Sequence, residues 1–275
     1  MSAAPPLAGV VGWPIGHSRS PRLHGHWLRA YGIDGHYVPL AVRPEDFAAA
    51  LPMLPRLGFR GVNVTLPMKE AALGLADVAS ERAARIGAAN TLTFRGSAVH
   101  ADNTDGYGFI ASLRQGAPDW RAGVGPALVL GAGGAARAIV DALLNEGVPE
   151  LRLANRTRAR AEGLAAHFGP RVRVVDWGGA NALKGAATIV NTTTMGMEGQ
   201  PALDIDLSLA PDGALVSDIV YAPLVTPLLR AAAARGLLVV DGLGMLLHQA
   251  VPGFEQWFGR RPEVDAALRA AVLAP

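Results

Sequence analysis

The chain has 275 residues, of which 50% are hydrophobic and 17% are charged, and it contains no cysteine. This composition excludes a disordered or fibrous protein, disulfide bonds, a thiolate nucleophile and a cysteine-bound zinc. A formal net charge of +2 gives no reason to expect a nucleic-acid or membrane surface. Because the sequence shows neither a signal peptide nor an apolar run of transmembrane length, we expect a cytoplasmic protein.

The N-terminal part of the chain alternates short apolar runs with amphipathic segments. Because strands that alternate with helices usually pair in parallel, this pattern predicts a parallel sheet with helices packed on it. A helix over 106–116 then leaves this region. The strands are expected over 7–15, 36–42, 61–66, 88–94 and 97–102, and the helices over 21–31, 44–57 and 67–76.

A second alternation of strands and helices begins at residue 127. In it, the pair Thr226-Pro227 is typical of a helix N-cap followed by proline at the first helical position. Two helices, at about 244–258 and 262–273, close the chain. The strands are expected within 127–130, 150–157, 171–177, 187–193, 213–221 and 237–242, with a helix over 158–169. The sequence thus predicts an α/β fold of two domains with a cleft between them.

A glycine-rich turn follows the apolar run 127–130, where residues 131–136 read GAGGAA and fit the pattern G-x-G-x-x-A. In such a turn Gly131 permits the tight bend, Gly133 lets backbone amides approach a pyrophosphate, and Ala136 lets helix and strand pack closely. The hexapeptide alone is weak, since helix starts rich in Gly and Ala are common. Its place within a βαβ unit predicts a dinucleotide site.

The end of the next expected strand indicates which dinucleotide binds. An NAD site usually has an Asp or Glu there to hold the ribose 2′-hydroxyl. This chain instead has Asn155-Arg156-Thr157, with Arg158 and Arg160 just beyond. A guanidinium with an amide and a hydroxyl suits a 2′-phosphate, so NADP is favoured over NAD. The alternative is an ordinary cationic helix start, which is mildly unfavourable against the helix dipole.

The other domain is then left to hold a substrate, and its polar residues lie where expected strands end. Ser20 precedes a proline and has the simple alternative role of a helix N-cap, so Ser18 is the better candidate for binding a substrate group. Alternation along 61–66 puts Asn63 and Thr65 on one face, which predicts solvent or a wet pocket there.

Further polar residues, Asn90-Thr91 and Asn103-Thr104-Asp105, occur at later strand ends, although Asp105 is also consistent with a plain helix N-cap. The seven histidines form no comparable group. His24 and His26 are two residues apart on a helix and face different ways. We therefore expect no metal.

Lys69 is unusual for this chain, because only it and Lys184 are lysine among 25 basic residues. Pro67 is expected to begin a helix, which places Lys69 in its first turn, where a cation is unfavourable. Lysine can lose its proton when buried, whereas arginine cannot at working pH. A lysine at this position therefore suggests a role in proton transfer.

The motifs, in this order, resemble those of the shikimate dehydrogenase family over nearly the whole chain. Several independent motifs in the right order are far more specific than any one of them. Gly25 departs from the family pattern, which usually has Asn after the histidine that matches His24, and this puts local helix packing in doubt. The matching stretches are 16–21, 61–70, 86–91, 103–105, the glycine turn, 155–157, 191–197, 218–221 and 242–249.

The resemblance implies an N-terminal α/β substrate domain over 1–106 plus 241–275 and a Rossmann-type NADP-binding domain over 107–240. It implies reversible reduction of 3-dehydroshikimate to shikimate by NADPH, in the shikimate pathway that leads to chorismate and the aromatic amino acids. Lys69 and Asp105 would be the catalytic pair. Around the substrate it implies Ser18, Ser20, Thr65, Lys69, Asn90, Asp105, Tyr221 and Gln249. For NADP it implies Gly131, Ala132, Gly133, Gly134, Ala135, Asn155, Arg156, Thr157, Arg160, Ile219 and Gly242, with Glu81 also near the cofactor.

Two alternatives stay open at this point. A quinate or quinate/shikimate dehydrogenase shares the fold and the Lys–Asp pair, although the acid-free segment 155–157 speaks against its NAD-using members. A non-catalytic NADP-binding protein has no need of a titratable pair. In either case we expect a small-molecule ligand, no nucleic-acid or membrane partner, and a monomer or homodimer.

Overall fold

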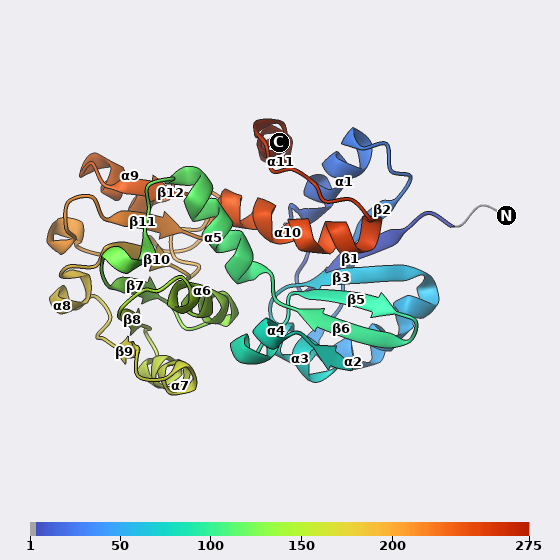
Figure 1. Ribbon diagram of the computed structural model, residues 1–275, viewed down its shortest axis with the longest axis horizontal. Coiled ribbons are helices and arrows are strands. Elements are labelled where there is room, and N and C mark those ends of the chain that lie inside the picture. The colour runs from blue at the N-terminus through green and yellow to red at the C-terminus, as the bar shows by residue number, and fades with distance from the viewer. Residues whose placement is uncertain (1–3, 275) are drawn as a thin grey trace. The chain divides into compact units, whose positions relative to one another are not determined.

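The computed structural model describes residues 4–274, without the side chains of residues 180 and 181. These residues form two compact units, whose elements are labelled in Figure 1. The first unit holds the residues up to Thr104 and those from Leu246 onward, and the second is Asp105–Met245. The sequence boundaries were expected at 106/107 and 240/241. Which unit binds which ligand stays a prediction.

The sheet of the first unit is mixed, in the order β2-β1-β3-β5-β6-β4. Strand β1 pairs in parallel with β2 and β3, whereas β5 runs antiparallel to both β3 and β6. The expectation of a parallel sheet was therefore wrong for β5, which is antiparallel to both of its neighbours and is joined to β6 as a hairpin by a two-residue turn at Gly96 (φ +62°). The strands are β1 (Leu7–Gly12), β2 (His36–Ala41), β3 (Phe59–Val64), β4 (Val78–Ala79), β5 (Thr91–Arg95) and β6 (Ala98–Asp102).

The expected helix over 44–57 was wrong. This segment is a chain of short turns, of which only α2 (Phe47–Ala50) is α-helical. Pro44, Pro52 and Pro55 interrupt it, because proline has no amide proton to continue the helical hydrogen bonds. The other helices that contribute to this unit are α1 (Ser20–Ala30), α3 (Lys69–Gly74), α4 (Glu81–Ile86), α10 (Gly242–Phe258) and α11 (Ala266–Leu273).

The end of α10 packs directly on the sheet of the first unit. A Cβ atom at Gly61 in β3 would lie only 2.0 Å from the indole nitrogen of Trp257, so no larger residue fits there. The Trp257 indole N–H donates to Thr93 Oγ1 (3.1 Å), and that hydroxyl donates to Gln256 Oε1 (2.8 Å). Helix α11 lies along α1, where Arg19 donates to the Val272 carbonyl (3.3 Å).

His24 lies at the centre of an aromatic cluster in the first unit. Its side chain has no exposed surface, and its ring stacks on Tyr37 with the centroids 3.8 Å apart. Trp27 lies edge-on at 5.7 Å and Phe254 at 5.8 Å. Burial lowers the pKa of His24 to about 3, against an opposing effect of the nearby Asn63 side chain. Neither ring nitrogen has a partner at hydrogen-bonding geometry within residues 4–274.

His24 should make the protein less stable in acid. The unfolded chain takes up this proton near the ordinary pKa of 6.5 and the folded chain only near 3, so the neutral ring's stabilising contribution is complete above pH 6.5 and is lost as the pH falls. At roughly 1.4 kcal/mol per pH unit, about 2 kcal/mol is lost at pH 5. Urea unfolding of His24→Phe between pH 7 and 4 should show a shallower fall than wild type.

The matched control for this experiment is His26→Phe, since His26 is on the same helix and partly exposed. Asp102, whose pKa is lowered by its bonds with Arg82 and Ser80 against an opposing burial effect, also weakens the fold in acid, but equally in all three proteins. Tyr37 supplies no charge to offset a protonated His24, because burial raises its pKa further. An unchanged slope in His24→Phe would contradict the assignment.

The sheet of the second unit is parallel throughout, as expected, in the order β12-β11-β10-β7-β8-β9. Numbered from β7, this is the strand order 6-5-4-1-2-3 of a dinucleotide-binding α/β fold, with its switch point between β7 and β10. The strands are β7 (Ala127–Leu130), β8 (Leu151–Ala154), β9 (Val172–Val174), β10 (Thr188–Asn191), β11 (Leu215–Asp218) and β12 (Leu238–Val240). The helices are α5 (Asp105–Gly116), α6 (Gly134–Asn145), α7 (Arg158–Phe168), α8 (Ala180–Leu183) and α9 (Pro227–Ala234).

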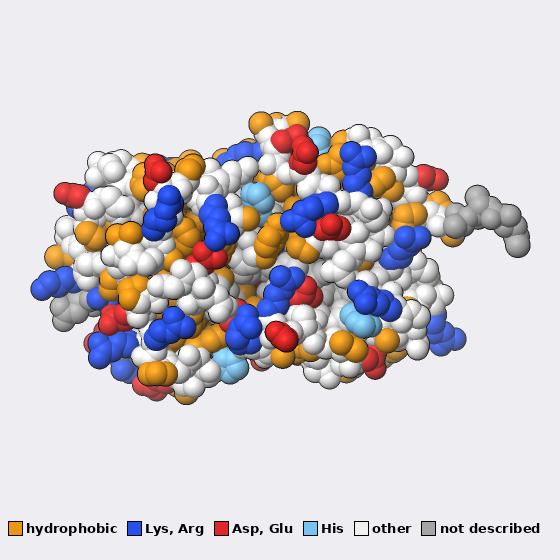
Figure 2. All heavy atoms as spheres, viewed as in Figure 1, with side chains coloured by type: hydrophobic (Ala, Val, Ile, Leu, Met, Phe, Trp, Pro, Cys, Tyr) orange, Lys and Arg blue, Asp and Glu red, His pale blue; other side chains and the backbone are white. Residues whose placement is uncertain are grey.

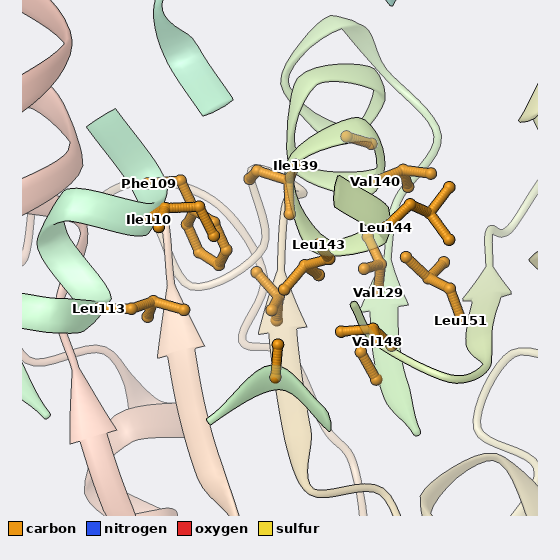
Figure 3. Packing of buried hydrophobic residues seen from close by; sticks show 14 of the residues in the cluster. Phe109, Ile110, Leu113, Val129, Ile139, Val140, Leu143, Leu144, Val148 and Leu151 are labelled. Carbon is orange, nitrogen blue, oxygen red and sulfur yellow. The ribbon is translucent and has the colours of Figure 1, made fainter. Parts of the chain in front are cut away.

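Helices α5 and α6 bury their apolar faces on this sheet (Figure 3). Phe109 and Leu113 from α5 meet Ile139 and Leu143 from α6 over Val129 of β7, and all five are almost fully buried. At the other end of the unit, the Thr226 hydroxyl accepts the Leu229 amide and Pro227 opens α9, which confirms the expected cap.

The surface carries both signs of charge. On the face in Figure 2, basic and acidic side chains are interspersed, as the small net charge leads one to expect. Within residues 4–274, none of the helices combines the length and the apolar character needed to cross a membrane.

Candidate active site

The glycine turn after β7 has the geometry that a pyrophosphate requires. Gly131 has φ +112°, and a Cβ atom there would lie 2.5 Å from Thr192 Oγ1. Gly133 is the extended N-cap of α6, and a Cβ there would meet nothing within 4 Å, so the backbone beside it is accessible to a ligand. Ala136 is fully buried against the sheet. The start of α6 therefore presents free amide groups to an anion. The remaining turn residues Ala132, Gly134 and Ala135 are partly exposed.

The end of β8 leads into α7 without an acidic residue. The Asn155 amide donates to the Thr157 carbonyl (2.8 Å), and Thr157 is the N-cap residue of α7. Arg158 is committed to two carboxylates, Glu162 at 2.9 Å and Asp176 at 2.7 Å. These contacts hold the chain at the point where a dinucleotide fold receives the adenosine ribose.

Two further arginines at this helix start remain available. Arg156 and Arg160 are exposed, and neither guanidinium group forms an ion pair or hydrogen bond with the described residues, in contrast to that of Arg158. A guanidinium without a carboxylate partner is a ready ligand for a phosphate dianion. The residues present thus fit NADP better than NAD.

Ile219 and Gly242 lie together in the second unit, as a shared cofactor role requires. Gly242 opens α10, and a Cβ atom there would lie 2.3 Å from both the carbonyl carbon and the carbonyl oxygen of Ile219. The Asp241 carboxylate caps the same helix start by accepting the Leu243 amide (3.0 Å). Only glycine permits this approach of α10 to the end of β11.

Asp218, the last residue of β11, was not assigned a role from sequence. It has no exposed surface, and its carboxylate accepts from Asn191 Nδ2 (2.9 Å), the Val220 amide (3.0 Å) and the Thr226 hydroxyl (2.7 Å). Burial raises the pKa of Asp218, and these three donors oppose the rise. Its place as a polar residue at the carboxyl end of an apolar strand is the signal that could have identified it.

In the first unit, a buried polar network surrounds Asn90. The side-chain oxygen of Asn90 accepts hydrogen bonds from the Thr104 amide (2.8 Å) and the Thr91 hydroxyl (2.9 Å). Its amide group donates to Gln249 Oε1 (3.2 Å). The fold thus brings together two expected substrate residues that are 159 positions apart in sequence.

Asn63 extends this network toward β2. Its amide donates to the Asn90 backbone carbonyl (3.2 Å), and its oxygen accepts the Tyr37 hydroxyl (2.7 Å). Asn63 is only 5% exposed, so the expected solvent or wet pocket on this face of the strand was wrong at Asn63. The protein's own polar groups satisfy it instead. Sequence reasoning missed Tyr37, which reads as an ordinary strand residue.

The two serines that follow β1 have the opposite local roles to those expected. The Ser18 hydroxyl accepts the Ser20 amide (3.3 Å), so Ser18 has the cap-like contact. Ser20 is the first residue of α1, whose N-cap position is Arg19, and it is 6% exposed. Thr65 lies just after β3 and is partly exposed. It packs closely on Gly12, since a Cβ atom at Gly12 would lie 2.5 Å from the Thr65 methyl group.

Lys69 is the first residue of α3 and so lies in the first turn of a helix, as expected, but the helix does not begin at Pro67. The Leu66–Pro67 peptide bond is cis, and Met68 occupies the N-cap position. The side chain of Lys69 is partly buried, and its backbone carbonyl accepts the Ala89 amide (2.9 Å). The start of α3 is thereby joined to the segment that carries Asn90.

The remaining expected residues belong to both units. Asp105 opens α5 in the second unit and is 5% exposed. Tyr221 is partly buried in the loop that follows β11, and Glu81 is exposed at the start of α4 in the first unit. No group of three or more side chains suited to holding a metal ion occurs in residues 4–274.

Comparison with known proteins gives matches to both units. Three family models match this chain: shikimate dehydrogenase substrate binding domain over residues 10–92, shikimate/quinate 5-dehydrogenase over 123–198, and shikimate 5′-dehydrogenase C-terminal domain over 242–272. A protein of Paracoccus denitrificans named shikimate dehydrogenase (NADP(+)) is 65% identical over 98% of this chain and 96% of its own length.

Two solved structures resemble the chain over nearly its whole length. Shikimate 5-dehydrogenase from Thermus thermophilus, in complex with NADP(H) and shikimate, is 39% identical with a TM-score of 0.87, and the match covers 97% of this chain and 98% of that one. Quinate dehydrogenase from Corynebacterium glutamicum, in complex with NAD, is 33% identical with a TM-score of 0.90, covering 98% and 99%. The fold is thus compatible with either cofactor, and the residues after β8 have to discriminate between them.

Proposed function

The chain belongs to the shikimate dehydrogenase family, and from this premise we infer that it catalyses the reversible NADPH-dependent reduction of 3-dehydroshikimate to shikimate. It is an NADP-dependent oxidoreductase of the pathway that leads to chorismate and the aromatic amino acids. The observation in this structure that carries the cofactor choice is the acid-free end of β8, with Arg156 and Arg160 unpaired among the described residues beside an accessible glycine turn.

We assign the cofactor's three parts to three places in the second unit. The turn Gly131–Gly134 and the first amides of α6 receive the pyrophosphate. Arg156 and Arg160, with Asn155 and Thr157, receive the 2′-phosphate. Ile219 and Gly242 line the nicotinamide end, which the close approach of α10 to β11 supports. When bound, NADP carries the hydride, and the protein is left to orient both reactants and to move a proton.

For the substrate we assign Ser18, Ser20, Thr65, Asn90, Tyr221 and Gln249. The Asn90–Gln249 hydrogen bond supports this assignment, because it fixes two polar side chains within one buried network. Lys69 transfers the proton to or from the substrate oxygen, and the Asp105 carboxylate assists it. Lys69 is partly buried in the first turn of α3, and an amine, unlike a guanidinium, can release and take up a proton.

One assay tests the proposed function. Reduction of the cofactor is followed spectrophotometrically with shikimate or quinate, each with NADP⁺ or NAD⁺. Shikimate with NADP⁺ should be the most active pair. A protein that binds NADP⁺ but turns over none of the four pairs would instead be a non-catalytic NADP-binding protein.

The same assay should show a preference for shikimate over quinate in kcat/KM of at least about tenfold. Quinate carries an additional hydroxyl on the ring carbon that bears the carboxylate, and the ring there is saturated. Ser18 and Ser20 are small donors that suit a carboxylate on a planar, unsaturated ring. The wrong substrate leaves polar groups of the pocket without a hydrogen-bond partner, which weakens binding of the transition state and lowers kcat/KM. A preference for quinate would place the enzyme with the quinate dehydrogenases.

We further propose that the enzyme works in the cytoplasm as a monomer or homodimer, without a nucleic-acid or membrane partner. The small net charge and the interspersed surface charges support the expectation that no nucleic acid or membrane is a partner. Size-exclusion chromatography with light scattering would determine the oligomeric state.

A further inference from the structure

Asp218 joins two loops at the ends of neighbouring strands. Through Val220 and Thr226 its carboxylate holds the loop that leaves β11, and through Asn191 it holds the loop that leaves β10. The three partners are all donors, and no cation pairs with this carboxylate in the described part of the chain. Two oxygen atoms that accept three hydrogen bonds are the pattern of an ionised carboxylate.

Asn191 passes this constraint to the loop after β10. Its side-chain oxygen accepts from the Thr193 amide (3.0 Å) and the Thr193 hydroxyl (2.8 Å), while its amide also donates to the Met195 carbonyl (3.1 Å). The next residue of the loop, Thr192, contacts the cofactor turn, because a Cβ at Gly131 would lie 2.5 Å from its hydroxyl. Thr192 itself is held by its own bond to the Leu130 carbonyl (2.7 Å), so the contacts of Asp218 fix the rest of the loop 192–195 and not the glycine turn.

The position of these loops follows from the strand order. In a sheet of this order the cofactor lies across the carboxyl ends of the strands, with its adenosine half on the side of β8 and its nicotinamide half on the side of β10 and β11. Asp218 is the last residue of β11, and Ile219 directly after it touches Gly242 of α10. Asp218 itself is fully buried, so it acts through its neighbours and not on the cofactor.

We propose that Asp218 is a positioning residue for the nicotinamide half of the cofactor. Its carboxylate holds the loop Ile219–Tyr221 and the loop 192–195 in one arrangement, which fixes the surface against which the nicotinamide ring is placed for hydride transfer. The adenosine half, held at the start of α7, does not depend on it. This inference rests on the proposed function, and it adds a residue to which neither the family resemblance nor the sequence gave a role.

The test compares two ligands that share the adenosine half. NADP⁺ occupies the whole cofactor site, whereas adenosine 2′,5′-bisphosphate lacks the nicotinamide. In Asp218→Asn the side chain keeps its shape but loses its charge and one acceptor. Calorimetry should show NADP⁺ bound about tenfold more weakly, the scale of one charged hydrogen bond, and adenosine 2′,5′-bisphosphate bound within about twofold of wild type. The kcat for shikimate should also fall.

Thr226 supplies a second pair of variants in case Asp218→Asn does not fold. Thr226→Val removes the hydroxyl that donates to Asp218 but keeps the shape, and should weaken NADP⁺ selectively. Thr226→Ser keeps the hydroxyl and should behave like wild type. Asp206→Asn, at an exposed turn cap where the carboxylate accepts the Ser208 amide (2.9 Å), is the control for loss of a charge.

The outcomes separate this inference from the proposed function. If the variants only lower the melting temperature, or weaken both ligands equally, Asp218 is a residue of the fold alone and the inference is overturned. Wild-type activity with shikimate and NADP⁺ is measured in parallel. If the wild type is active and the variants bind NADP⁺ normally, the positioning role fails while the proposed function stands.

Discussion

Lys69→Arg is expected to lower kcat for shikimate oxidation by roughly 10²–10⁴, the usual contribution of a positioned acid or base. Interconversion of an alcohol and a ketone moves a proton at oxygen as well as a hydride at carbon, and the cofactor carries only the hydride. Arginine keeps the positive charge at the first residue of α3 but cannot release a proton at working pH. The affinity for shikimate should therefore fall much less than kcat. Steady-state kinetics and calorimetry on the same variant measure the two quantities.

The chain supplies a matched control, since its other lysine, Lys184, is exposed in the second unit. Lys184→Arg makes the same chemical change outside the proposed site and should leave kcat unaltered. If Lys69→Arg turns over near the wild-type rate, Lys69 is only an electrostatic anchor and the proton is transferred elsewhere.

The second large effect concerns the cofactor. Arg156→Ala should weaken NADP⁺ binding by about tenfold to a hundredfold, because a charge-assisted hydrogen bond is worth roughly 1.5–3 kcal/mol. NAD⁺ has no 2′-phosphate, so its affinity should change little. Titration of intrinsic fluorescence or calorimetry with each cofactor gives both dissociation constants, and their ratio isolates the 2′-phosphate contact.

Arg158→Ala is the appropriate comparison, because Arg158 lies two residues further along but already pairs with Glu162 and Asp176. Its removal should leave the NADP⁺/NAD⁺ preference nearly unchanged. An equal loss of both cofactors in Arg156→Ala would show that this arginine supports the loop without contacting the phosphate.

Sequence predicted the fold well where the spacing of apolar residues matched the strand or helix and no proline interrupted it. The parallel sheet of the second unit followed from its alternating strands and helices. The segment 44–57 was misjudged because its apolar spacing is helical while its three prolines break the backbone hydrogen bonds. The β5–β6 hairpin was missed because a Gly-Ser pair is a weaker turn signal than Asn-Gly.

The site divides in the same way. For the cofactor half, the prediction needed only local motifs, since the glycine turn and the residues after β8 lie within one contiguous βαβ unit. For the substrate half, sequence supplied polar residues at strand ends but not their partners. Ser18 and Ser20 exchanged their expected local roles, and Asn63 proved to be satisfied inside the protein.

What the sequence by itself determined was therefore the family and the choice of NADP, because each of the motifs on which they depend is a short run of neighbouring residues. Only the tertiary structure decided which polar residues are buried together. Asn90 meets Gln249 across 159 positions, and Asp218 meets Asn191 across 27. A buried polar side chain is stable only when a partner satisfies it, and partners this distant in sequence are chosen by the packing of strands and helices and not by any local pattern.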